Sequence, residues 1–220
     1  PRFAADVAVD GNLVYLGSPT DGSTTPVLEH GEVEIWLNEG GGVFEFNDAV
    51  SGDRDNVTFG DQFGSNIDVD AGLLIVGAPF DQDRAGAAYF FDCSEATLCQ
   101  RTAKFVGDVL TDGEFGYDVE IEGDLALVSA RLSGNAPLSG NAVLYRRVNG
   151  NWNETTQLFD PTDAESTDEY VVLGLDAGAV VLGSSLEDQH GYDAGAVFAF
   201  RVPEENEVVN PAGIGVSPAS

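Results

Sequence analysis

The stretch that decides the fold covers residues 63–79 and reads FGSNIDVDAGLLIVGAP. Apolar and polar residues alternate from Ile67 to Asp70, which is the period-two pattern of a half-buried strand. Ala71-Gly72 then supplies small residues for a tight turn. The following run, Leu73–Ala78, is apolar throughout, as expected of a strand that is buried on both faces. The stretch therefore predicts two antiparallel strands, the second of which lies between two layers.

Three features of this stretch recur along the chain in a constant order, which indicates four copies of one unit. An alternating strand and tight turn begin at Val7, Ile67, Val119 and Leu173. An apolar run ends in small residues at Gly17-Ser18-Pro19, Gly77-Ala78-Pro79, Ser129-Ala130 and Gly183-Ser184. A glycine precedes an aromatic residue by five positions at Gly31 and Trp36, Gly86 and Phe91, Gly140 and Tyr145, and Gly195 and Phe200.

Each unit reads as strands, because β-branched and aromatic residues dominate and Gly, Asp and Asn mark the turns. In the second unit we expect strands near residues 65–69, 73–78, 87–92 and 102–107. Four strands in a repeat of this length are typical of a propeller blade. The sequence thus predicts an all-β fold, a β-propeller of four-stranded antiparallel blades, with units at about residues 1–50, 51–108, 109–160 and 161–202.

Phe63-Gly64 and Gly77-Ala78-Pro79 together resemble the FG-GAP repeat, which builds the propellers of integrin α subunits and of many exported bacterial proteins. The third unit keeps Phe115-Gly116, whereas the fourth has Glu169-Tyr170 at that place. The resemblance implies a propeller and says little about function. Propellers of this family usually have seven blades, so these four units could form a complete ring, part of a larger ring, or a ring closed by another chain.

The fourth unit has three clear strands, which end near Arg201. The remaining segment, residues 203–220, is rich in proline, glycine and small residues and reads as a linker or an exchanged strand. An unpaired third strand would invite pairing with another chain. We therefore expect self-association through residues 203–220 as one use of this tail.

The charge balance is extreme, with 38 acidic residues against 9 basic ones and a net charge of −29. This excess excludes nucleic acid as a partner, because binding phosphates needs a basic face. No stretch is long and apolar enough to insert in a membrane as a helix. The acids either keep the protein soluble or hold a divalent cation.

Calcium is the candidate cation, and no other cofactor is predicted. The best ligand set is Asp163, Glu165 and Asp168, which places carboxylates at nearly alternate positions before the fourth unit. The calcium loop that the FG-GAP family often carries between its first two strands does not fit here, because the chain has only tight turns at those places.

Cys93 and Cys99 are the only cysteines, and their spacing predicts a small disulfide-closed loop between two strands. A disulfide points to an oxidising compartment, so we expect a secreted or cell-surface protein. The sequons at Asn56 and Asn153 are glycosylation candidates if the source glycosylates exported proteins.

The sequence contains no nucleophile elbow and no phosphate-binding glycine loop, so we expect that the protein is not an enzyme. The leading hypothesis is a non-catalytic extracellular adhesion or binding module, whose partners are other protein chains or surface glycans. The alternative is a self-assembling structural subunit of an extracellular filament or surface layer, in which the tail completes a neighbouring subunit. A hydrolase that uses a pair of carboxylates is the third hypothesis.

Overall fold

The structure, a computed structural model, describes residues 4–19, 31–53, 60–94, 98–107, 113–131, 141–158, 170–184 and 196–202. These residues form strands and one short helix, α1 (Asp81–Arg84). The predicted all-β class is confirmed. The tail at residues 203–220 lies outside the described residues.

The strands form four antiparallel sheets, and each sheet uses consecutive strands. Sheet 1 contains β1 (Asp6–Asp10), β2 (Leu13–Ser18), β3 (Glu32–Gly40) and β4 (Val43–Ser51). Sheet 2 contains β5 (Ile67–Asp70), β6 (Leu73–Ala78), β7 (Ala87–Asp92) and β8 (Gln100–Val106). Sheet 3 contains β9 (Phe115–Glu122), β10 (Leu125–Ala130), β11 (Asn141–Val148) and β12 (Asn151–Leu158). Sheet 4 contains β13 (Tyr170–Asp176), β14 (Ala179–Ser184) and β15 (Ala196–Arg201).

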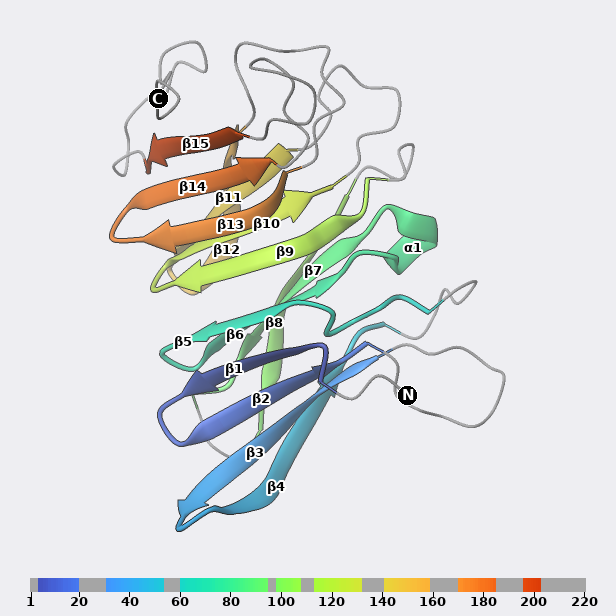
Figure 1. Ribbon diagram of the computed structural model, residues 1–220, viewed down its shortest axis with the longest axis vertical. Coiled ribbons are helices and arrows are strands. Elements are labelled where there is room, and N and C mark those ends of the chain that lie inside the picture. Colours follow the sequence, from blue (N-terminus) through green and yellow to red (C-terminus); the bar gives the residue numbers. More distant parts are fainter. Residues whose placement is uncertain are drawn as a thin grey trace.

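The sheets follow one another in chain order along the longest axis of the molecule (Figure 1). Their first strands, β1, β5, β9 and β13, lie side by side, and sheets 1 and 4 occupy opposite ends of the row. The described part of the chain is therefore an open row of sheets rather than a closed ring.

The second sheet matches its predicted strands closely, with differences at the first and last strands. Strand β5 begins at Ile67, two residues after the predicted start, and ends at Asp70. Strand β8 begins at Gln100, two residues before the predicted start, because pairing with β7 continues to Asp92 across a bulge. All six residues of β6 are buried, as the unbroken apolar run predicted. Ala71 and Gly72 both have positive φ, which is the geometry of the tight hairpin turn whose twist suits flanking strands.

Glycines meet at the joint between neighbouring sheets. A Cβ atom on Gly77 would lie 2.1 Å from the carbonyl oxygen of Gly116, and one on Gly17 would lie 2.2 Å from that of Gly64. Gly64 and Gly116 both have φ of +84°, which favours glycine. The Phe-Gly pair of one sheet thus docks on the small residues that end the second strand of the preceding sheet.

The third recurring glycine belongs to the same joint. A Cβ atom on Gly31 would lie 2.1 Å from the carbonyl oxygen of Phe63, and one on Gly86 would lie 2.2 Å from that of Phe115. Three sequence anchors therefore recur together because they meet at one point of close backbone approach.

Apolar cores fill the space between sheets. The core between sheets 1 and 2 includes Tyr15, Ile35, Phe63, Leu74 and Tyr89. The core between sheets 2 and 3 includes Ile75, Phe90, Val119, Tyr145 and Trp152. The core between sheets 3 and 4 includes Leu127, Leu144, Leu173 and Leu182. Sheets 2 and 3 each contribute to a core on both of their faces, whereas sheets 1 and 4 each contribute to one core, and this burial stabilises the row.

Candidate functional site

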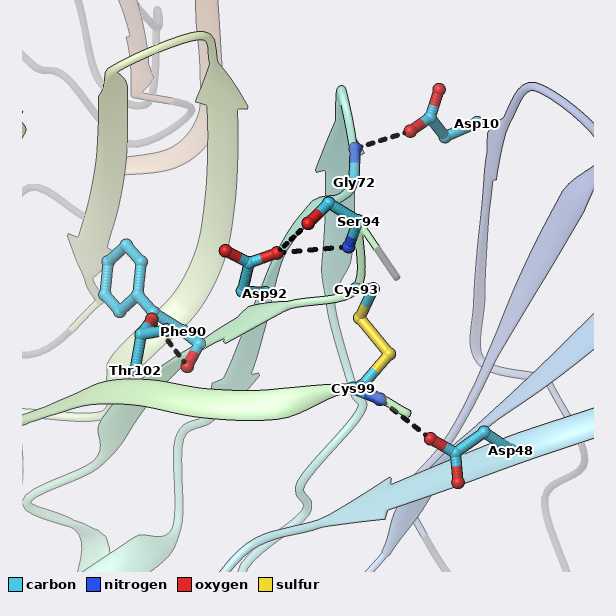
Figure 2. Close-up of a disulfide and its surroundings, with 9 residues drawn as sticks. All are labelled: Asp10, Asp48, Gly72, Phe90, Asp92, Cys93, Ser94, Cys99 and Thr102. Atoms are coloured by element: carbon cyan, nitrogen blue, oxygen red, sulfur yellow. Dashed lines mark hydrogen bonds between the residues drawn. A yellow bond between two sulfur atoms is a disulfide. The ribbon is translucent and has the colours of Figure 1, made fainter. Parts of the chain in front are cut away.

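The predicted disulfide between Cys93 and Cys99 is present and joins the end of β7 to the start of β8 (Figure 2). The amide of Cys93 donates to the carbonyl oxygen of Gly72 at 2.7 Å. The amide of Cys99 donates to the carboxylate of Asp48 in sheet 1 at 3.0 Å. The bridge therefore fixes the connection between two strands and ties it to the neighbouring sheet.

The predicted calcium ligands Asp163, Glu165 and Asp168 lie outside the described residues. Within the described ranges, no group of three His, Cys, Asp or Glu side chains is arranged to hold a metal ion. The sequon residue Asn56 is also outside these ranges, whereas Asn153 is exposed on β12.

Asp81, at the start of α1, belongs to a buried polar network. Its carboxylate lies 2.9 Å from the amine of Lys104 and accepts a hydrogen bond from the hydroxyl of Tyr89. The same amine lies 3.0 Å from Asp53, which follows β4. Burial and the Asp81 carboxylate raise the pKa of Tyr89. The network therefore fixes the end of sheet 1 to sheet 2, and the carboxylate of Asp81 is used in these contacts.

A hollow of about 260 Å³ lies beside the disulfide. Its lining residues are Asp92, Ser94, Leu98, Gln100, Arg101 and Thr102. Leu98 is 57% exposed, so the hollow combines an apolar side chain with polar walls.

The charges in this hollow are fixed near neutral pH. Hydrogen bonds from the hydroxyl and the amide of Ser94, at 2.5 and 3.1 Å, hold the pKa of Asp92 below its usual value. The carboxylate of Asp53 raises the pKa of Arg101 through a hydrogen bond. An anion and a cation that keep their charges suit the binding of a polar ligand better than proton transfer.

The outer face of sheet 1 is a second candidate surface. Cross-strand pairing places Val7 beside Leu16, and Val9 in a row with Val14, Trp36 and Phe46. We define this outer face by these six residues. Val7, Val9 and Phe46 are 52%, 62% and 54% exposed. The ring of Trp36 packs edge-on against Phe46, with centroids 5.6 Å apart.

The equivalent positions in the other sheets are buried against the preceding sheet. The repeat aligns Val7 with Ile67, Val119 and Leu173, which are 5%, 2% and 6% exposed. It aligns Trp36 with Phe91, Tyr145 and Phe200, which pack in the three cores between sheets. The outer face of sheet 1 therefore has the composition of a sheet-packing face and is left uncovered by the described residues.

The far end of the row carries another exposed apolar face. On sheet 4, Val172, Val181 and Val197 are 60%, 38% and 63% exposed. The third strand, β15, pairs only with β14 among the described residues. Within the described part of the chain, sheet 4 thus presents both an apolar face and a strand edge.

Acidic residues of the first strands form a feature that sequence reasoning missed. In six cases a carboxylate on one sheet accepts a hydrogen bond from a backbone amide on the next sheet, at N···O distances of 2.6–3.0 Å. The pairs are Asp6 with Ile67, Asp10 with Gly72, Asp68 with Ile121, Asp70 with Gly123, Asp118 with Leu173, and Glu122 with Ala177. We call these contacts the carboxylate–amide bonds. The sequence signal that could have indicated these bonds is an acid at alternate positions of otherwise apolar strands.

Four antiparallel sheets, joined by carboxylate–amide bonds at all three joints and by glycine contacts at the first two, define a protein built from repeated β units. Residues 48–91, which run from β4 to β7, match the family model of the FG-GAP repeat. The chain therefore contains an FG-GAP repeat, which confirms the resemblance seen in the sequence. A comparison with curated proteins finds no match.

The residues that the structure describes include no helix of sufficient length and apolar character to span a membrane.

Proposed function

We propose that the chain is a non-catalytic β-propeller-type module that acts outside the cell and binds another protein. The observation that carries this proposal is the outer face of sheet 1, which has the composition of an interior face and remains exposed. Exposed apolar patches of this kind mark interaction sites. The FG-GAP repeat and the disulfide support a binding role and an extracellular location.

Replacing Val9 with aspartate is expected to weaken binding to the outer face of sheet 1 about 10-fold or more, because a charge would have to be desolvated at the contact. Peptides selected from a random display library on the immobilised wild-type protein serve as probes. Their affinity for the wild-type and Val9→Asp proteins is measured by biolayer interferometry.

Val148→Asp is the matched control, because Val148 is 37% exposed at the end of β11 in sheet 3. It should bind the selected peptides as the wild type does. Equal affinity for wild type and Val9→Asp would refute the assignment of this face. Turnover in a broad glycosidase and esterase screen would refute the non-catalytic role, and binding on a glycan array alone would favour surface glycans as partners.

Self-assembly into a filament or surface layer is the second candidate function. It is favoured by the exposed valines at both ends of the row of sheets, since sheet 4 of one copy could pack on sheet 1 of another. The net charge of −29 opposes this contact at low ionic strength. Salt at about 1 M reduces the Debye length to about 3 Å and removes most of that repulsion.

Sedimentation velocity tests this candidate. We expect the wild-type protein to form larger species in about 1 M salt, and we expect Val197→Asp and a chain without residues 203–220 to form fewer. Discrete monomers of the wild-type protein at every salt and protein concentration would reject self-assembly. Equal assembly with and without residues 203–220 would show that the tail does not complete a neighbour.

A further inference from the structure

We propose that Glu120 on sheet 3 and Asp68 on sheet 2 share one proton, and that this shared proton makes the joint between the two sheets tighter in mild acid than above neutral pH. The pair lies on neighbouring first strands, β9 and β5, which are in contact. This device is separate from the proposed binding surface, which lies on the other side of sheet 1.

The hydrogen bonds of Asp68 decide which group carries the proton. One oxygen of Asp68 accepts from the amide of Val69 at 2.8 Å, and the other accepts from the amide of Ile121 at 2.8 Å. Glu120 also hydrogen bonds the Asp68 side chain. Two carboxyl groups can bond in this way only if one of them is protonated. Because Asp68 acts as an acceptor for two amides, Glu120 is the donor.

The groups around this pair are also acidic. On β9, the strand of Glu120, the carboxylate of Asp118 accepts hydrogen bonds from the amides of Val119 and Leu173 at 3.1 and 2.8 Å. On β1, Asp6 accepts from the amides of Val7 and Ile67, both at 2.8 Å. The charges of Asp68, Asp118 and Asp6, each of which accepts backbone amides, therefore act together on Glu120.

Among the described residues, the charged groups that act most strongly on Glu120 are the acids Asp68, Asp118 and Asp6. Strand β10 places Leu127 opposite Glu120, and β6 and β7 cover β9 with the apolar core between sheets 2 and 3. The remaining acids of the first strands lie at the far hairpins: Asp10, Asp70, Glu122 and Asp176. The first three of these accept amides of the next sheet.

Burial raises the pKa of Glu120 to about 7, and the charges of Asp68 and Asp118 add to the shift. Burial also raises the pKa of Asp68 and of Asp118. The folded protein therefore keeps a proton on Glu120 between pH 4.5 and about 7 that the unfolded chain releases. Stability from this group is greatest in acid and falls as the pH rises through this window.

Urea unfolding between pH 5.5 and 8.5 tests the proposal, with the fluorescence of Trp152 in the core between sheets 2 and 3 as the signal. Trp36→Phe removes the other tryptophan and serves as the reference protein. We expect its unfolding constant to rise about 10-fold across this range, after allowance for solvent screening of a half-buried group.

Glu120→Gln is expected to remove most of this rise, because its amide still donates to Asp68 but does not titrate. Glu154→Gln is the matched control, because it removes the same charge from an exposed position on β12. It should keep the full rise. Parallel pH profiles for the reference and Glu120→Gln proteins would overturn the proposal.

If Glu120→Gln fails to fold, infrared spectroscopy of the carboxyl groups provides a second test of the shared proton. Infrared difference spectra of the reference protein between pH 6 and pH 8 should show the loss of a protonated carboxyl band. Asp68→Asn, which removes the charge that faces Glu120, should shift this loss to lower pH. An unchanged carboxyl region in the reference protein, or an unshifted band in Asp68→Asn, would contradict the shared proton.

Discussion

Replacing Gly77 with alanine is expected to lower the free energy of unfolding by about 3 kcal/mol, because the new methyl group has no room in the joint between sheets 2 and 3. Its Cβ atom would lie 2.1 Å from the carbonyl oxygen of Gly116. The obstacle is backbone, so no side-chain rotation relieves it. Urea unfolding monitored by circular dichroism measures the loss.

Gly183→Ala is the matched control, since Gly183 holds the same place in the repeat on sheet 4. The nearest atom to its added Cβ is 3.5 Å away, an ordinary contact. This substitution should change stability by less than about 1 kcal/mol. If Gly77→Ala and Gly183→Ala cost the same, the glycines would not be retained for close approach of neighbouring sheets.

Replacing Phe90 with alanine is the second large effect, with an expected loss of about 3–5 kcal/mol. Phe90 on β7 is fully buried in the core between sheets 2 and 3. Its ring centroid lies 4.8 Å from that of Trp152, 5.7 Å from that of Phe105 and 5.8 Å from that of Tyr145. The substitution removes contacts across two sheets and leaves a cavity, and calorimetric unfolding reports the loss.

Phe44→Ala provides the comparison, because Phe44 is 50% exposed on β4. Removing this ring should cost less than about 1 kcal/mol. A small effect at Phe90, equal to that at Phe44, would mean that the core between sheets 2 and 3 contributes little to holding the row together.

The fold could be predicted because its anchors serve one purpose. The glycines and the Phe-Gly pair recur in order because they meet at the joint between sheets. The sequence departs from the motif in the last two units: Ser129 stands in place of the glycine in the third unit, and Glu169-Tyr170 stands in place of the Phe-Gly pair in the fourth. The hydroxyl of Ser129 instead accepts from the amide of Asp118 at 2.9 Å. A local sequence pattern was sufficient to predict the repeated sheets because close approach of two backbones requires glycine.

The candidate surfaces and the shared proton could not be predicted in the same way. Alternation shows that Asp68 and Glu120 lie on strands, but it does not show which strands are neighbours or which amides lack a partner. The acids therefore read as a solubilising charge, although several of them join sheets. The sequence places Trp36 at the same point of the repeat as Phe91, but the structure leaves it on the outer face of sheet 1 because no described sheet precedes it.

The carboxylate–amide bonds give the row a polarity. Sheets 1, 2 and 3 supply acids to the next sheet, and sheets 2, 3 and 4 supply the amides that bind them, so the second and third units contain both halves of the bond. A gene that encodes such a unit can be duplicated in tandem and yield another compatible layer without any new partner residue. Sheet 4 carries Val172 where sheets 1 and 3 have Asp6 and Asp118, and Gly174 where sheet 2 has Asp68. It can therefore end such a series but would pass on fewer of these bonds.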